Sequence, residues 1–180
     1  MDAVVHLAGR VHVMDSRFRG NDKSGGNDES GGNDELLAFR KVNVLGTERL
    51  ARVAAKAGVK RFIFISSVKV NGEGVRDSSA CGLRMTKNVY TEKDVPAPQD
   101  AYGVSKMEAE QVLACVAGET GLQVVILRLP LVYGAGVKAN FKNLIKLAGS
   151  GLPLPFKGIN NRRSFLYVGN LVDAIGVCVE

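Results

Sequence analysis

Short apolar runs of strand length alternate along this chain with longer segments that have helical spacing, and this alternation limits the possible folds most strongly. Apolar runs of about four to eight residues suit buried strands, whereas longer segments with one apolar face suit helices. The strand-like segments are Asp2 to Ala8, Arg61 to Ser66, Gln123 to Leu129 and Ser164 to Val168. The second and third are mostly apolar, which predicts strands covered on both faces. Strands that alternate with helices predict an α/β fold with a parallel sheet.

Helices are expected in four segments, which are 36–57, 101 to about 117, 139–147 and 170–179. Gly58 is placed to end the first helix, because glycine readily adopts the left-handed conformation that follows many helices. Asp100 is placed to cap the second helix, and Gly118 is expected to close it. The long polar segment from Ser67 to Gln99 is predicted to be a loop.

Residues 15–35 form a low-complexity segment in which KSGGND at 23–28 is followed by ESGGND at 29–34. Gly, Ser, Asn and Asp bury too little apolar surface to offset the entropy lost on ordering. A loop of this length is unusual inside a compact domain. The segment is therefore predicted to be an insertion without regular structure.

The size and composition of the chain suit one globular domain, with 180 residues, 46% of them hydrophobic and 23% charged. The longest apolar stretch, Val124 to Val137, contains Arg128 and Pro130, so no membrane-spanning helix is expected. The first residues lack the basic segment of a secretory signal. Three widely spaced cysteines without a CxxC pair, and only two histidines, predict no metal site and a reduced cytoplasmic setting.

The formal net charge of +6 is unevenly distributed along the chain. Between Thr120 and Val172 there are seven basic residues and no acidic residue. A one-sided basic field favours an anionic ligand, but the dense basic runs and interleaved aromatic residues of a nucleic-acid surface are missing. A phosphate-bearing small molecule is therefore favoured over nucleic acid. A merely solvated basic face is the alternative for the lysines in this segment.

Tyr102 and Lys106 lie four residues apart at the start of the predicted helix, so they share one face of it. A free phenol has a pKa near 10 and is a poor base at neutral pH. A neighbouring cation would favour the phenolate and bring its pKa toward the range where proton transfer is efficient. By itself the spacing is a weak signal, since an ordinary amphipathic helix can start in the same way.

Ser66 and Ser67 directly follow the RFIFI strand, at the carboxyl end where parallel sheets place their ligands. A serine, a tyrosine and a lysine in this order resemble the Ser-Tyr-Lys triad of the short-chain dehydrogenase/reductase superfamily. The chain most resembles the extended branch, the NAD-dependent sugar-nucleotide epimerases and dehydratases. The matching pieces are VVHLAG (4–9), KVNVLGTERLARVAAKAGVKRFIFISS (41–67), PQDAYGVSKMEAE (98–110), VVILRLPLVYGAG (124–136) and RRSFLYVGNLVDA (162–174).

The resemblance implies a role for each member of this triad. Tyr102 would be the general acid and base, and Lys106 would lower its pKa and bind the nicotinamide ribose. Ser67 would bind the substrate hydroxyl, with Ser66 as the alternative or merely as a strand cap.

The resemblance also implies residues that contact the cofactor or the substrate. Ala8 and Gly9 match the turn that lets NAD approach the backbone, and Pro130 matches a turn beside the nicotinamide. Asn43 matches a position that faces the cofactor, although a polar helix residue that bonds a neighbouring strand is an equally good interpretation. Contacts to the nucleotide diphosphate are implied for Asn140 and Arg163, whose planar guanidinium suits phosphate, and Arg162 could exchange roles with Arg163.

The chain also departs from the pattern that it resembles. No GxxGxxG sequence, the loop that holds the pyrophosphate in the family, occurs in these 180 residues. The acidic residue that binds the adenosine ribose in the family is also missing, so the sequence does not distinguish NAD from NADP. We therefore expect a partial Rossmann-type domain over 1–180, without the first strands and the Gly-rich loop, with the start of a substrate lobe at about 134–168.

The function that the resemblance implies is NAD-dependent epimerisation of a nucleotide-diphosphate sugar by a homodimer. Tyr102 would take the proton of the sugar 4-hydroxyl while a hydride passes to the nicotinamide, and the return of the hydride to the rotated keto-sugar would invert the centre. A dehydratase is disfavoured, since Val68 and Lys69 stand where dehydratases resemble one another in an Asp-Glu pair. A keto-sugar reductase and a non-catalytic truncated remnant remain as alternatives.

Overall fold

The computed structural model describes residues 2–11, 30–72, 90–135, 146, 147, 149 and 164–180. The chain divides into two compact units, Met1–Arg128 and Leu129–Glu180. None of the described helices is long and apolar enough to cross a membrane.

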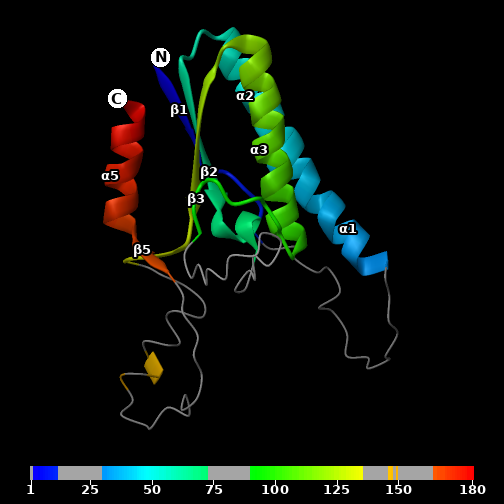
Figure 1. The fold of residues 1–180 in the computed structure, drawn as a ribbon, viewed down its shortest axis with the longest axis vertical. Helices are drawn as coiled ribbons and strands as arrows, with labels where there is room; N and C mark the ends of the chain where they lie inside the picture. Colours follow the sequence, from blue (N-terminus) through cyan, green and yellow to red (C-terminus); the bar gives the residue numbers. More distant parts are fainter. Residues whose placement is uncertain (1, 12–29, 73–89, 136–145, 148, 150–163) are drawn as a thin grey trace, which may run out of the picture. The chain divides into compact units, whose positions relative to one another are not determined.

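The first unit is built on a sheet of three strands, β1 (Ala3–His6), β2 (Arg61–Ser67) and β3 (Gln123–Leu129), in the order β1-β2-β3 (Figure 1). β1 and β2 pair in parallel, with Ala3 opposite Arg61 and His6 opposite Phe64. The predicted α/β fold with a parallel sheet is confirmed.

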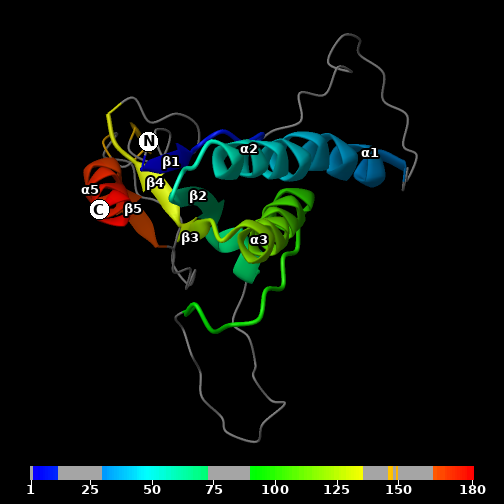
Figure 2. The same cartoon turned by 90° about the horizontal axis from the view of Figure 1, so that it is seen from above.

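Helices α2 (Leu45–Lys56) and α3 (Ala101–Thr120) lie side by side on one face of this sheet (Figure 2). Phe62 and Phe64 of β2 are fully buried in the core that they share with Ala51 of α2 and with Leu113 and Val116 of α3. Alternate residues of a strand point to one face, so Phe62 and Phe64 both reach these helices. The core therefore lies between β2 and the two helices.

The predicted helix over 36–57 is longer and less regular than expected. It consists of α1 (Ser30–Phe39), a π-helical turn (Arg40–Val44) and α2. The prediction of irregular structure throughout 15–35 was therefore wrong for its last six residues, Ser30 to Glu35, which are helical. Once a helix is nucleated, each added residue contributes a hydrogen bond, so a packed helix can extend into a polar sequence. Gly58 follows α2 with φ of 75°, as predicted for a helix-ending glycine.

Helix α3 begins where the sequence predicts and ends later. Asp100 caps it, since its Oδ1 accepts a hydrogen bond from the Gly103 N–H at 2.6 Å. The predicted end at Gly118 was wrong, because the helix continues to Thr120 and Gly121 takes the left-handed conformation with φ of 74°. Gly118 is exposed, so nothing in its surroundings forces the helix to stop there.

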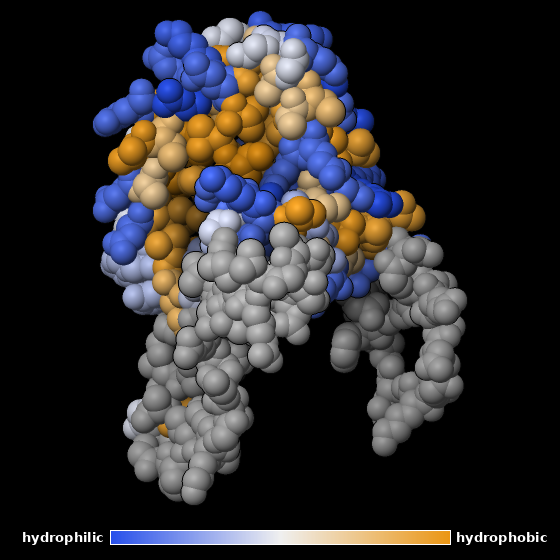
Figure 3. All heavy atoms as spheres, in the orientation of Figure 1, coloured by the Kyte–Doolittle hydropathy of each residue, from blue (hydrophilic) through white to orange (hydrophobic). Residues whose placement is uncertain are grey.

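β3 has the predicted bounds, but it is not covered on both faces. None of its seven residues is fully buried. Ile126 is 37% exposed, and apolar residues reach the visible surface in the region of β3 (Figure 3). Among the described strands β3 stands at the end of the order β1-β2-β3.

The second unit has a parallel pair of short strands, β4 (Leu131–Tyr133) and β5 (Phe165–Tyr167), and helix α5 (Val168–Val179). Tyr133 packs against the rings of Phe165 and Tyr167, with centroid distances of 6.5 and 5.7 Å. The predicted extended segment and last helix are present, although α5 begins two residues early, at Val168, and β4 was not predicted. Most of the predicted helix over 139–147 lies outside the described residues, and the substrate lobe stays a prediction.

Candidate active site

The carboxyl end of β2 and the first turn of α3 bring Ser67 and Tyr102 together. Ser67 ends β2, and a 3₁₀ turn (Val68–Asn71) follows it. Lys69 in this turn forms an ion pair with Asp100, the cap of α3, two residues before Tyr102. The Ser67 side chain lies next to the Tyr102 phenol and lowers its pKa, and the Ser67 hydroxyl accepts from the Lys69 N–H at 3.3 Å.

Tyr102 is partly buried, and its ring meets that of Phe39 at a centroid distance of 5.9 Å. Burial raises the pKa of the Tyr102 phenol, and the negative charge of Asp100 adds to the rise. Lys69 and the Ser67 hydrogen bond act in the opposite direction on this pKa. The sequence led us to expect a lowered pKa, but burial outweighs the charges near the phenol in this structure.

Lys106 lies on the same side of α3, with its ammonium directed at β2. Its Nζ donates a hydrogen bond to the Ile65 carbonyl at 2.9 Å and lies 4.5 Å from the centroid of the Phe64 ring. The side chain is almost fully buried, and this burial lowers the pKa of Lys106 to about 8, while Glu110 opposes the shift. Its ammonium contacts the backbone of β2, and Lys106 is not among the groups that shift the pKa of Tyr102, unlike the expectation from the spacing.

The loop after β1 approaches Lys106 closely. A side-chain carbon added to Gly9 would lie 3.2 Å from Lys106 Nζ and 3.5 Å from Asn43 Oδ1. Ala8 and Gly9 are both exposed. The absence of a side chain at Gly9 therefore lets the backbone of this loop come close to the Lys106 ammonium. Contact of Ala8 and Gly9 with a cofactor stays a prediction.

Asn43 lies in the π-helical turn and is buried. Its amide accepts from the Arg10 N–H at 2.7 Å, donates to the Arg10 carbonyl at 3.0 Å, and donates to the Ser105 hydroxyl at 3.0 Å. Ser105 in turn donates to the Tyr102 carbonyl at 2.8 Å. These bonds match the interpretation of Asn43 as a polar residue that ties a neighbouring segment in place. Contact between Asn43 and a cofactor stays a prediction.

Ser66 and Ser67 point to different partners. The Ser66 hydroxyl is buried and donates to Glu110 Oε1 at 2.5 Å. Ser66 shares the face of β2 that carries Phe62 and Phe64 and meets the middle of α3, whereas Ser67 ends the strand and lies next to Tyr102. The predicted contact of Ser67 with a substrate hydroxyl stays a prediction.

His6 was not selected from the sequence. It ends β1 in a buried position, bonds Thr47 Oγ1 through Nε2 at 2.9 Å, and stacks on Phe64 at 5.7 Å. Burial, followed by the charge of Lys106, lowers the pKa of the His6 imidazole. The only signal for His6 in the sequence was its place at the end of the first apolar run, and this signal did not indicate which residues it would contact.

The remaining predicted residues are not placed relative to this cluster. Pro130 stands between β3 and β4 in the second unit. Asn140, Arg162 and Arg163 lie outside the described residues. Among the described residues no three His, Cys, Asp or Glu side chains form a cluster that could hold a metal ion.

A sequence profile of the NAD dependent epimerase/dehydratase family matches residues 25–180. The chain belongs to this family. A UDP-glucose 4-epimerase of Vibrio cholerae is 44% identical over 178 residues, which are 98% of this chain and 47% of that protein. An N-acetyl-alpha-D-glucosaminyl-diphospho-ditrans,octacis-undecaprenol 4-epimerase of Escherichia coli O157:H7 is 32% identical over 74% of this chain and 38% of that protein.

Solved structures of enzymes that bind nucleotide sugars or NAD share the fold of this chain. MoeE5 in complex with UDP-glucose and NAD matches with a TM-score of 0.70 and 28% identity, over 100% of this chain and 52% of that chain. Similar structures include complexes with NAD and with NADPH. This chain spans about half the length, or less, of the relatives that it matches.

Proposed function

We propose that this chain carries the catalytic residues of an NAD-dependent epimerase that acts on a nucleotide-diphosphate sugar. The observation that carries the proposal is the contact between Ser67 and Tyr102 next to a buried Lys106. The 44% identity to a UDP-glucose 4-epimerase supports the reaction class.

Tyr102 exchanges a proton with the sugar hydroxyl in this proposal. Burial raises the pKa of its phenol, so the free site holds the proton at neutral pH and the group is ready to act as an acid. Action as a base requires a positive charge close to the phenolate, and Lys69 is the described cation that lowers the pKa of this phenol. Ser67, which lies next to the phenol, would orient the same sugar hydroxyl.

NAD supplies the hydride acceptor and donor when it is bound. The backbone at Gly9 comes close to the Lys106 ammonium, since an added side-chain carbon would lie only 3.2 Å from Nζ. Lys106 would bind the nicotinamide ribose, and the small residues Ala8 and Gly9 would let it approach. Because no GxxGxxG occurs in these 180 residues, this chain offers one end of a dinucleotide site.

The experiment that tests the function uses a chimera in which these residues replace the matching segment of the Vibrio cholerae relative. Interconversion of a UDP-hexose and its C4 epimer is followed by NMR. Tyr102→Phe should lower turnover by about 10²–10⁴-fold, the usual loss when a general acid or base is removed. Tyr90→Phe is the matched control and should keep turnover, because its hydroxyl bonds the Gly72 carbonyl at 3.2 Å, away from Ser67. Near-normal turnover in Tyr102→Phe would remove this residue from the mechanism.

The chain by itself should bind NAD weakly. Affinity for a dinucleotide depends on holding both ends at once, and Lys106 and Gly9 reach only the nicotinamide end. Calorimetric titration of the purified chain with NAD measures this affinity directly. Micromolar binding would contradict the expectation and would show that other residues of the chain hold the pyrophosphate.

A further inference from the structure

A buried ion pair lies one helical turn beyond Lys106 and takes no part in the proton transfer described above. Glu110 of α3 accepts three hydrogen bonds from Arg128 of β3, at 2.7, 3.1 and 3.2 Å. The side chain of Glu110 is only 7% exposed and that of Arg128 is 23% exposed. The two residues join the middle of α3 to the carboxyl end of β3.

This ion pair holds the chain on both sides of Ser67. On one side, Glu110 accepts the hydrogen bond of the Ser66 hydroxyl at 2.5 Å. On the other side, Arg128 Nη1 donates to the buried Asn71 Oδ1 at 3.2 Å, at the end of the 3₁₀ turn. Ser67 therefore lies between two anchored positions, and its place relative to α3 depends on the ion pair.

Stability alone does not explain a buried ion pair at this position. Removing two charges from water is unfavourable, and apolar residues of similar volume often stabilise a protein as well or better. All the buried polar side-chain atoms among the described residues have hydrogen-bond partners, so the group is complete as built. A fully satisfied polar network of this kind holds its members in one arrangement.

We propose that Glu110, together with Arg128, is a positioning residue that keeps Ser67 against Tyr102 and keeps a negative charge beside Lys106. The inference rests on the proposed function, because it assigns these contacts to the same site. It adds two residues, Glu110 and Arg128, that act through Ser67 and Lys106.

The charge of Glu110 matters because few charged groups in the described part of the chain face Lys106. On α3 itself Glu110 is one turn away and favours the protonated amine. From β1 the facing titratable group is His6, whose imidazole is driven toward its neutral form by burial and by Lys106. From β2 the contacts are the Ile65 carbonyl and the Phe64 ring, and neither of them titrates. Glu110 is therefore the group that opposes the effect of burial on Lys106.

The first test separates the charge of Glu110 from its shape. In Glu110→Gln the amide can still accept the Ser66 hydrogen bond, but the negative charge is lost. The pKa of Lys106, followed by NMR of ¹³C-methylated lysines and assigned with Lys106→Arg, should fall further below 8. Glu108→Gln is the matched control, since Glu108 pairs with Arg40 at 2.8 Å and should leave the Lys106 pKa unchanged. An unchanged Lys106 pKa in Glu110→Gln overturns the electrostatic part of the proposal.

The second test removes the Glu110–Arg128 ion pair without leaving either charge unpaired. Glu110→Met combined with Arg128→Met replaces both charges with apolar side chains, a change that buried ion pairs often tolerate. Loss of the Ser67 contact should then raise the pKa of Tyr102 further, as seen by NMR of ¹³C-labelled tyrosines. Ser66→Ala, which keeps the ion pair, should raise the Tyr102 pKa in the same direction and serves if the double variant does not fold. A folded variant with an unchanged Tyr102 pKa overturns the positioning role.

These titrations need neither cofactor nor substrate. They therefore give a result even if the chimera turns over no sugar nucleotide, which would contradict only the proposed function. If the pKa values of Lys106 and Tyr102 shift in the variants but the chimera has no turnover, the positioning role is supported and the proposed reaction is rejected. If the chimera turns over substrate but these pKa values do not shift, the proposed reaction is supported and the positioning role is rejected.

Discussion

The two halves of α3 pack on the same sheet but use different kinds of side chain. The first half contributes buried Ser105, Lys106 and Glu110, each bonded to other elements of the first unit. The second half contributes buried apolar residues, Leu113 and Val116, and its polar contacts lie at the surface. Burial of polar groups is unfavourable unless they are fully bonded, so their concentration in one half makes that half the candidate site.

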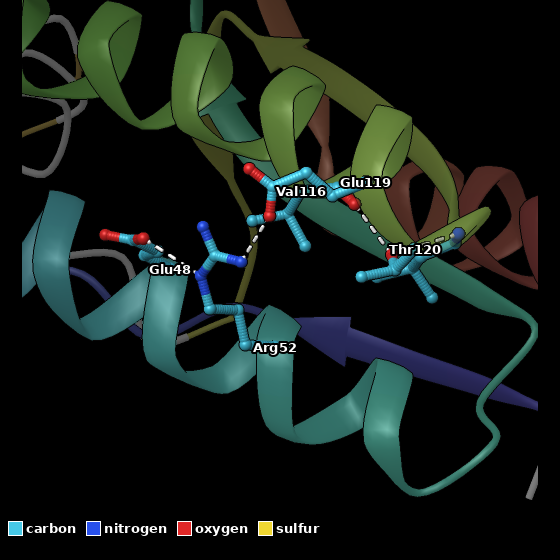
Figure 4. Close-up of polar contacts among 6 residues, drawn as sticks. Glu48, Arg52, Val116, Glu119 and Thr120 are labelled. Carbon is cyan, nitrogen blue, oxygen red and sulfur yellow. Dashed lines mark hydrogen bonds and ion pairs between the residues drawn. The ribbon is translucent and has the colours of Figure 1, made fainter.

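The surface contacts of the second half are shown in Figure 4. Arg52 of α2 bonds Glu48 at 3.0 Å and Glu119 of α3 at 2.5 Å; Arg52 and Glu119 are exposed and Glu48 is partly exposed. Thr120 turns its hydroxyl back to the Val116 carbonyl at 2.7 Å. This end of α3 needs only to hold two helices together, and it does so with an apolar core and a solvated rim.

The largest loss of stability is expected from Leu113→Ala in the apolar half. Leu113 is fully buried between α3, α2 and β2, and removal of a buried leucine side chain leaves a cavity. The free energy of unfolding in urea should fall by about 2–5 kcal/mol. The pKa of Lys106 should stay near 8 in this variant, provided that it is measured where the protein is folded. A large change in that pKa would show that the two halves are not independent.

A smaller and pH-dependent effect is expected from Lys106→Met in the polar half. Since burial lowers the pKa of Lys106 to about 8, the unfolded chain binds more protons than the folded one between pH 8 and its ordinary value of 10.5. The stability contributed by this group should therefore rise as the pH rises through 8 and be lost as the pH falls through it. Urea unfolding of both proteins from pH 7.5 to 9.5 should show this rise in the wild type and not in Lys106→Met. Parallel curves would mean that the folded-state pKa of Lys106 is not depressed.

The smallest effect is expected from Arg52→Ala at the solvated rim. Exposed ion pairs contribute little, because water screens the charges and the long side chains lose conformational freedom when they pair. The urea midpoint should stay close to that of the wild type, and added salt should reduce any remaining difference. A loss comparable to that of Leu113→Ala would show that the rim between α2 and α3 contributes as much to stability as the core.

The sequence predicted the local features of the site well. The start of α3 at Asp100 and the ends of β2 and α2 depend on short-range preferences of aspartate, β-branched and aromatic residues, and glycine. The predicted bounds were wrong where tertiary packing extends a helix beyond the residues whose local preferences favour it. Examples are the helical residues Ser30 to Glu35 and the continuation of α3 past Gly118.

The sequence by itself therefore determined the alternation of strands and helices and the placement of Tyr102 and Lys106 on one helical face. Both follow from backbone periodicity, which every local segment carries. Only the tertiary structure decided that Ser67 rather than Ser66 meets Tyr102, that Lys106 bonds the Ile65 carbonyl, and that Glu110 pairs with Arg128. Those outcomes depend on which distant groups share a low-dielectric interior, where burial and pairing set both the geometry and the charge of each side chain.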